Sequence, residues 1–228
     1  MRVLGIDTST LKTCAGLIDD GKDIASFELS SNMFNSEELV EMVGDIFKKL
    51  DYKLKDIDLI AVGIGPGSFT GTRIAVTIAR TFAQTLGIEI KGVSSLKAMA
   101  LNYEGEGIIL PLFDAKRGRA YYGIYKNQGE IENLKEDSLK HIDEIMEELR
   151  EFKEEIVVLG PGRDVFLENL QKEFKVVKYK DGMIHGTNVA HLGQLEYGKF
   201  GGDNLFEVLP NYINPSQAER EFGKKTRC

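Results

Sequence analysis

The chain repeats one order of predicted elements twice along its 228 residues. From residue 3, and again from residue 108, the pattern predicts a strand that ends in Asp, two further strands, a helix, a strand that ends in Gly-Pro-Gly, and a helix. The most alike pieces are IAVGIGPG at residues 60–67 and IVVLGPG at residues 156–162. Chance similarity between two α/β halves is the alternative, but the Asp after the first strand of both halves argues against it.

Two βββαβα units in tandem determine the fold class that we predict. The class is α/β, a duplicated ribonuclease-H-like fold with the architecture of actin-like ATPases and sugar kinases. We place the boundary between the halves at the polar segment over residues 102–107 (NYEGEG). The first domain then covers residues 1–103, and the second covers residues 104–228 with a C-terminal tail.

Two helices of the first half carry a clear apolar periodicity. One begins near Asn35, which can cap it with Glu38 as the reciprocal partner, and the other covers residues 70–86 and ends at Gly87. Apolar residues follow helical spacing at Leu39, Val43, Ile46, Phe47 and Leu50, and again at Ile74, Ala75, Ile78, Ala79, Phe82 and Ala83. Val40, Met42 and Val76 lie outside these stripes, which indicates either ordinary variation or an interface with a partner of similar fold.

Charge and composition narrow the function classes. The chain has 29 Lys and Arg against 36 Asp and Glu, a net charge of −7, which argues against a protein that holds nucleic acid by itself. Only the last ten residues (EREFGKKTRC) turn basic. Two cysteines, Cys14 and Cys228, predict free thiols in a reducing cytosol. The uncharged stretch over residues 59–72 is too short and too rich in Gly to span a bilayer, so we expect a cytoplasmic protein with no membrane partner.

A glycine-rich loop over residues 65–71 (GPGSFTG) lies between a predicted strand and a predicted helix. Free N–H groups at a helix N-terminus can hold a phosphate, although a purely structural turn is an equal alternative. The loop is not a P-loop, because no Gly-Lys-[Ser/Thr] ends it, and it is not G-x-G-x-x-G, because position 68 is Ser. The candidate residues of a degenerate phosphate site or partner site here are Gly65, Pro66, Gly67, Ser68, Thr70, Gly71 and Arg73.

Two further loops lie where actin-like ATPases hold magnesium and phosphate. Asp7, Thr8 and Ser9 follow the first strand, but Ser9 stands where those ATPases have Gly. Asp114 follows the first strand of the second half, in a segment (DAKRG) without a run of glycines. We therefore disfavour independent ATPase or kinase chemistry. A nuclease of the ribonuclease-H type is disfavoured further, because it needs three or four carboxylates on two metals.

The remaining chemical groups form no recognisable site. His141, His185 and His191 are not spaced as a metal pair, and the two cysteines are far apart, so we predict no metal site. No G-x-S-x-G nucleophile elbow is present. The sequence thus offers an enzyme-like fold for which we expect no catalytic residue and no independent activity.

Four segments resemble the bacterial TsaB (YeaZ) family. They are MRVLGIDTST at the start, GPGSFTGTRIAVTIARTFAQTLGIEIKGVSSL from residue 65, DAKRGRAYYGIY from residue 114 and LPNYINPSQAE from residue 209. The similarity is close over residues 1–125 and looser afterwards. Family members often have His at the position of Asn35, so any role of that His is in doubt here.

The resemblance implies a non-catalytic subunit in tRNA modification. It would support the paralogue TsaD, which transfers threonylcarbamoyl to the adenosine beside the anticodon, and would work with the ATPase TsaE. The tRNA would be held mainly through the complex, and whether the basic tail contacts it directly stays open. The helices over residues 35–50 and 70–86 would meet the equivalent helices of TsaD, or those of a second copy when TsaD is absent. The implied interface residues are Leu39, Val40, Val43, Ile46, Phe47, Ile74, Ile78 and Phe82, and we expect Val43 to be the cleanest probe.

A comparison with TsaD-like chains predicts that this chain lacks a metal site that the paralogue has. TsaD-like chains carry H-x-x-x-H where this chain has Ser95 and Met99. A hydroxyl and a thioether cannot replace two imidazoles as ligands of a hard or borderline metal ion. We expect no cofactor on this chain alone, and leave open whether ATP or ADP binds at the partner interface against Asp7 or the loop over residues 65–71. A nucleotide-dependent ATPase or kinase and a peptidase, as in the superfamily's "glycoprotease" name, are the competing functions.

Overall fold

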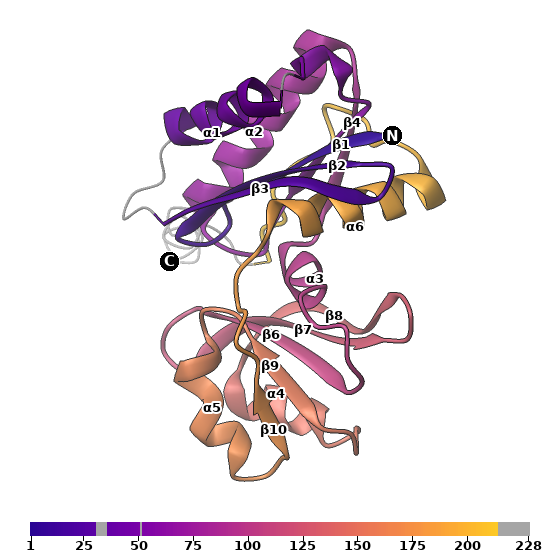
Figure 1. Ribbon diagram of the computed structural model, residues 1–228. Helices are drawn as coiled ribbons and strands as arrows, with labels where there is room; N and C mark the ends of the chain where they lie inside the picture. Colours follow the sequence, from indigo (N-terminus) through magenta and orange to yellow (C-terminus); the bar gives the residue numbers. More distant parts are fainter. Residues whose placement is uncertain (31–35, 51, 214–228) are drawn as a thin grey trace, which may run out of the picture.

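The computed structural model describes residues 1–30, 36–50 and 52–213 (Figure 1). Its first half contains a five-stranded sheet, sheet A, in the order β3-β2-β1-β4-β5. The strands are β1 (Arg2–Asp7), β2 (Lys12–Asp19), β3 (Lys22–Ser30), β4 (Leu59–Gly63) and β5 (Glu89–Val93). Every residue of the interior strand β4 is buried, as expected for a strand that is covered on both faces.

The second half contains a sheet of the same size and connectivity, sheet B, in the order β10-β9-β6-β7-β8. Its strands are β6 (Ile108–Asp114), β7 (Arg119–Asn127), β8 (Ile131–His141), β9 (Ile156–Leu159) and β10 (Val176–Lys178). Read from β8, this order repeats that of sheet A, with antiparallel pairs among the first three strands and parallel pairs to the last two. The predicted duplicated ribonuclease-H-like fold is therefore confirmed.

Helices cover both faces of each sheet, so the molecule has five layers (Figure 1). On the outer face of sheet A lie α1 (Ser36–Leu50) and α2 (Phe69–Leu86), and on the outer face of sheet B lie α4 (Ile142–Leu149) and α5 (Arg163–Gln171). Between the sheets lie α3 (Ser95–Ala100) and α6 (Gly186–Phe200), which contact each other. A single 3₁₀ turn, η1 (Leu54–Asp56), precedes β4 within the described ranges.

The two central helices are exchanged between the halves. Helix α3 follows the last strand of sheet A but packs on strands β6, β7 and β8 of sheet B. Helix α6 follows the last strand of sheet B but packs on the strands of sheet A. The apolar cluster that joins them includes Cys14, Leu96, Met99, Phe113 and Ala190, so it draws residues from both halves.

Two glycines of sheet A let α6 approach the sheet closely. A Cβ added at Gly5 would lie 2.1 Å from the carbonyl oxygen of Gly186, and one added at Gly16 would lie 2.2 Å from the amide nitrogen of Thr187. Real Cβ atoms do not approach other atoms so closely. The first turn of α6 therefore rests on the bare backbone of β1 and β2.

The end of α2 at Gly87 is as predicted, and two serines cap the starts of α2 and α3. The Ser68 and Ser94 side chains accept hydrogen bonds at the starts of α2 and α3, and Gly87 ends α2 with φ of 67°. The predicted cap at Asn35 lies outside the described residues.

A histidine links the connection before α6 to sheet A. His185 Nδ1 lies 2.8 Å from Glu28 Oε1 on β3, and its Nε2 lies 2.8 Å from Asp181 Oδ2. Burial lowers the pKa of His185, but the hydrogen bonds to the two carboxylates outweigh burial, so its pKa is raised above its ordinary value.

This link predicts a pH-dependent stability. Because the folded-state pKa is raised, the stabilisation is fully present below the unfolded pKa of about 6.5 and is lost as pH rises through the higher folded-state value. Denaturant unfolding between about pH 5.5 and 8.5 should show a steeper loss of unfolding free energy in the wild type than in a His185→Gln variant. Parallel curves for the two proteins would contradict the link.

Candidate functional site

Asp7, the first predicted site residue, is wholly buried at the end of β1. Its Oδ1 accepts hydrogen bonds from the backbone N–H and the hydroxyl of Ser9, each at 2.7 Å. Its Oδ2 accepts one from the Ser95 hydroxyl at 2.5 Å. Burial raises the pKa of Asp7, and the bonds from the two serines oppose that rise without cancelling it. Both carboxylate oxygens are thus engaged by donors of the chain itself.

The loop over residues 65–71 closes onto the loop that follows Asp7. The Ser68 N–H donates to the carbonyl oxygen of Ser9 at 2.7 Å, and the Thr8 hydroxyl donates to the carbonyl oxygen of Gly71 at 2.5 Å. A Cβ at Gly67 would lie 2.4 Å from the carbonyl oxygen of Ser9. The structure therefore brings together the predicted residues of these two loops, in a contact too close to admit a phosphate between Gly67 and Ser9.

The other predicted residues of this group lie at its edges. Gly65 exchanges hydrogen bonds with Ser95, at 3.1 Å to the hydroxyl and 2.9 Å from the Ser95 N–H. Thr70 and Arg73 are exposed in the first turns of α2, and Pro66 is buried.

Asp114 lies apart from this group, at the end of β6 in sheet B. Its carboxylate accepts hydrogen bonds from the backbone N–H of Lys116 at 2.8 Å and from its ammonium group at 2.7 Å. Burial works to raise the pKa of Asp114, but these bonds outweigh it, and the pKa is lowered. The second half therefore repeats the position of Asp7 without its buried hydroxyl partners.

Two consecutive serines at the start of α3 connect the halves, a feature that sequence reasoning missed. Ser95 binds Asp7 of sheet A, whereas the Ser94 hydroxyl donates to Asp137 Oδ2 on β8 at 2.5 Å. The Tyr125 hydroxyl donates to the other oxygen of Asp137. Asp137 follows no motif, so the sequence carries no signal for this contact. Because α3 starts between the sheets, its first turn reaches a buried carboxylate in each half.

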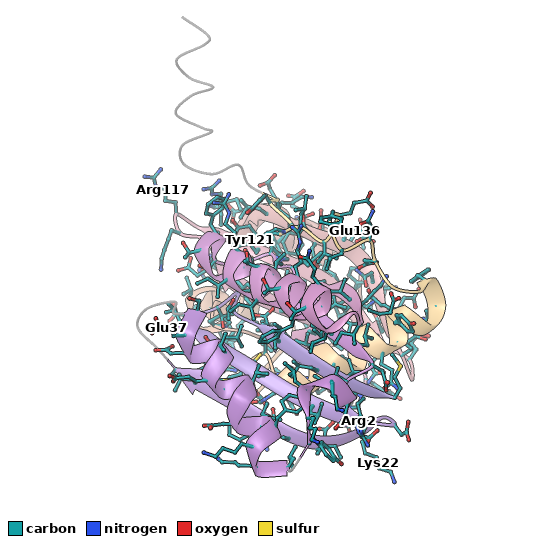
Figure 2. The ribbon with its side chains drawn as sticks, turned by 90° about the horizontal axis from the view of Figure 1, so that it is seen from above. Arg2, Lys22, Glu37, Arg117, Tyr121 and Glu136 are labelled. Atoms are coloured by element: carbon teal, nitrogen blue, oxygen red, sulfur yellow. The ribbon has the colours of Figure 1, made fainter. Side chains whose placement is uncertain are left out.

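A groove on the outer surface runs between α1 and α2. Figure 2 looks onto these helices, which lie side by side, with Glu37 at the start of α1. The groove has a volume of about 310 Å³ and is lined by Ser36, Phe69, Thr70, Arg73, Ile74, Thr77 and Ile78. Val40 lies one turn along α1 from Ser36 and is 46% exposed. This face combines exposed apolar side chains with a hollow, as protein interfaces often do.

Most of the predicted interface residues are core residues of this chain instead. Val43 is 2% exposed, and it packs in the cluster that fills the space between α1, α2 and sheet A, together with Leu39, Ile46, Phe47 and Ile78. The expectation that Val43 is the cleanest interface probe is therefore wrong, because a partner cannot reach it. Ile74 and Phe82 are partly buried, and Val40 is exposed. Met42 and Val76, the other residues outside the stripes, are buried as well.

Two further features of the described residues bear on other functions. In the described ranges, no group of three or more His, Cys, Asp or Glu side chains is placed to hold a metal ion. No helix within residues 1–30, 36–50 and 52–213 is long and apolar enough to cross a bilayer.

Comparison with known proteins decides the family. The family model of TsaD, the tRNA N6-adenosine threonylcarbamoyltransferase, matches residues 32–194. The tRNA threonylcarbamoyladenosine biosynthesis protein TsaB of Bacillus subtilis is 30% identical over 97% of this chain and 98% of its own length. The chain belongs to the TsaB family. The TsaB protein of Escherichia coli is 32% identical over 81% of this chain and 80% of its own length.

Solved structures of TsaB relatives share the fold. YeaZ from Pseudomonas aeruginosa superimposes with a TM-score of 0.77 at 22% identity, over 92% of this chain and 99% of that one. A second Pseudomonas aeruginosa protein, described as similar to peptidase YEAZ, gives a TM-score of 0.82 at 23% identity, over 93% and 99% of the two chains. The resemblance to the TsaB family, first drawn from four sequence segments, is confirmed.

Proposed function

We propose that this chain is a partner subunit for threonylcarbamoyl transfer to tRNA, pairing with TsaD and supporting it rather than performing the transfer. The curated TsaB relatives carry this biosynthetic pathway in their names, and the TsaD family model covers most of the chain. The observation that carries a supporting role is the state of Asp7: both of its oxygens accept hydrogen bonds from serines of the same chain. Three of the roughly four acceptor sites of this buried carboxylate are thus filled by the chain itself, which leaves it little capacity to hold a metal ion or take part in catalysis.

The groove between α1 and α2 is the surface proposed to meet TsaD. Besides exposed Val40 and Phe69, this face contains Gly44 in the middle of α1. A Gly inside a helix destabilises it by about 0.5–1 kcal/mol relative to Ala. No atom in the described part of the chain, beyond the helix backbone itself, lies within 4 Å of a Cβ at Gly44, so packing within the chain does not require the Gly. A partner helix that approaches α1 closely would require it.

The glycine provides a test with opposite signs. Gly44→Ala should raise the unfolding free energy of the isolated chain by about 0.5–1 kcal/mol, because it removes a helix-destabilising residue. The same methyl group should weaken binding to TsaD about fivefold or more, because it keeps the partner helix at a distance. Denaturant unfolding and calorimetric titration measure the two effects. Gly198→Ala, at an exposed and equally open position of α6, is the control and should change stability only.

The finer assignments extend this proposal. We propose that ATP or ADP binds only where TsaD completes the site. In the isolated chain, the loop that follows Asp7 and the loop over residues 65–71 are hydrogen-bonded to each other. TsaE joins the assembled pair, tRNA is held mainly by the complex, and a second copy occupies the α1–α2 face when TsaD is absent. The complex works in the cytoplasm. Titrating ADP into the isolated chain and then into the TsaD complex, with sedimentation of the isolated chain, tests these points.

Reconstitution tests the function itself. Purified TsaD, TsaE, tRNA and threonylcarbamoyl adenylate should modify tRNA when this chain is present and lose most of that activity without it. Two competing classes have their own readouts. ATP turnover by the isolated chain with magnesium would favour an ATPase or kinase. Discrete fragments of TsaD after incubation would favour a peptidase. Full modification without this chain would overturn the proposal.

A further inference from the structure

The segment after α6 forms a strap, residues 203–213, that crosses from the edge of sheet A to the start of α2. The strap begins at Asp203, whose N–H donates to the carbonyl oxygen of Ile90 at 2.9 Å. The Asp203 carboxylate accepts hydrogen bonds from the Gly92 N–H at 2.9 Å and from the ammonium group of Lys91 at 2.6 Å. The Lys91 side chain is 8% exposed, so this ion pair is largely shielded from solvent. The first end of the strap is thereby fixed to β5.

The strap is fixed at two more points before it reaches α2. Val208 is buried in the core cluster of sheet A. The Asn211 N–H donates to the carbonyl oxygen of Ile64 at 2.7 Å, directly before the loop over residues 65–71. These contacts bring the next residue, Tyr212, to the first turns of α2.

Tyr212 holds two residues of the groove. The Arg73 Nε donates to the Tyr212 hydroxyl at 2.5 Å, and the Phe69 and Tyr212 ring centroids lie 5.0 Å apart. The Arg73 guanidinium lies 3.7 Å from the Phe69 ring centroid and 5.3 Å from that of Tyr212. Both Arg73 and Phe69 line the groove between α1 and α2. One aromatic ring from the strap therefore sets the position of both side chains.

The charge of Arg73 is not neutralised within the described part of the chain. No carboxylate of those residues pairs with it, and its Nε is its one group bonded there, to an uncharged hydroxyl. Among the described residues its terminal nitrogens have no acceptor, and they form a planar fork of donors that matches a carboxylate. A free arginine side chain loses up to about 2 kcal/mol of conformational freedom when it is fixed, and Tyr212 imposes that loss before any partner arrives.

We propose that Tyr212 is a positioning residue for the partner-binding groove, which presents a pre-ordered Arg73 to a carboxylate of the partner subunit. This inference rests on the proposed function, because it assigns the groove to TsaD. It adds that Tyr212, near the end of the strap, belongs to the binding surface and that the partner is acidic where it meets the start of α2.

A double-mutant cycle on the full-length chain tests the proposal. Affinity for TsaD is measured by calorimetric titration for the wild type, Tyr212→Phe, Tyr212→Ala, Arg73→Ala and the double variant. Tyr212→Phe keeps the ring and loses the hydrogen bond, so it should weaken binding about 3- to 10-fold, and Tyr212→Ala should weaken it about 10- to 50-fold. Tyr212→Ala should have a much smaller effect when Arg73 is already Ala, because only the contact of Tyr212 with Phe69 is then left to lose. A purely structural role would not produce this dependence.

Controls separate the ways in which the test can fail. Leu209→Ala removes an exposed strap residue that lies outside the Arg73 contacts and should bind as the wild type does. Melting temperatures identify any variant that is misfolded. If Tyr212→Ala is misfolded, the conclusion rests on the affinity of Tyr212→Phe for TsaD. If the wild type binds TsaD and Tyr212→Ala binds it equally well, this inference alone is overturned. Additive effects of Tyr212→Ala and Arg73→Ala on the binding free energy would overturn it in the same way. Absence of binding by the wild type overturns the proposed function, and this inference with it.

Discussion

Val43→Glu should prevent the chain from folding, whereas Val40→Glu, three residues earlier in the same helix, should fold and lose its partner. Val43 is 2% exposed in the core beneath α1, where a carboxylate would find no hydrogen-bond donor or opposite charge. Burying an unpaired charge costs about 3–5 kcal/mol or more, against a total stability of about 5–15 kcal/mol for a typical protein. Val40 is 46% exposed, so a Glu there stays hydrated and should change stability by about 0.5 kcal/mol or less.

Binding to TsaD distinguishes the two variants further. Val40→Glu places a charge beside the apolar groove and should weaken TsaD binding about tenfold or more. Circular dichroism and denaturant unfolding report the fold, and co-purification with TsaD reports the interface. Glu41→Gln, on the adjacent exposed position of α1, serves as a control for a simple change of charge. If Val40→Glu co-purifies at the wild-type yield, the α1–α2 face is not the interface.

Gly16→Ala should destabilise the chain by about 3 kcal/mol or more. Its new methyl group would lie 2.2 Å from the backbone nitrogen of Thr187, and a clash with backbone cannot be relieved by rotating a side chain. Helix α6 would have to move off sheet A, which opens the apolar cluster between the sheets. Thermal and denaturant unfolding measure the effect. Gly198→Ala adds the same methyl group to an open position of α6 and should be neutral or stabilising, so equal losses in the two variants would contradict this explanation.

Local signals in the sequence predicted the elements and their order well. Repetition of one element order predicted the duplicated topology, and Gly87 marked the end of α2, because a C-terminal cap depends on neighbouring residues. Periodicity placed Val43 in the apolar stripe of its helix and Val40 outside it, but it could not show whether the chain's own sheet or a partner covers that stripe.

Contacts between distant residues explain what the sequence could not predict. Asp7 was a candidate phosphate-site or partner-site residue, and its second oxygen is bound by Ser95, 88 positions away. Periodicity likewise shows that a helix has an apolar face but not which sheet it covers, so the exchange of α3 and α6 was not foreseen. Tyr212 belonged to a segment known only by resemblance, and its contact with Arg73 spans 139 positions.

The exchange of α3 and α6 also governs the order in which the chain can mature during synthesis. Nascent chains emerge from the ribosome N-terminal end first, and separate domains usually fold in that order. Here the inner face of sheet A stays uncovered until residues 186–200 have been made, because α6 is what covers it. The first half must therefore remain, with apolar surface in water, until α6, the last helix of the described residues, has been made. Translation pauses after residue 103 should thus leave a protease-sensitive intermediate that chaperones bind, and release of the completed chain should end that sensitivity.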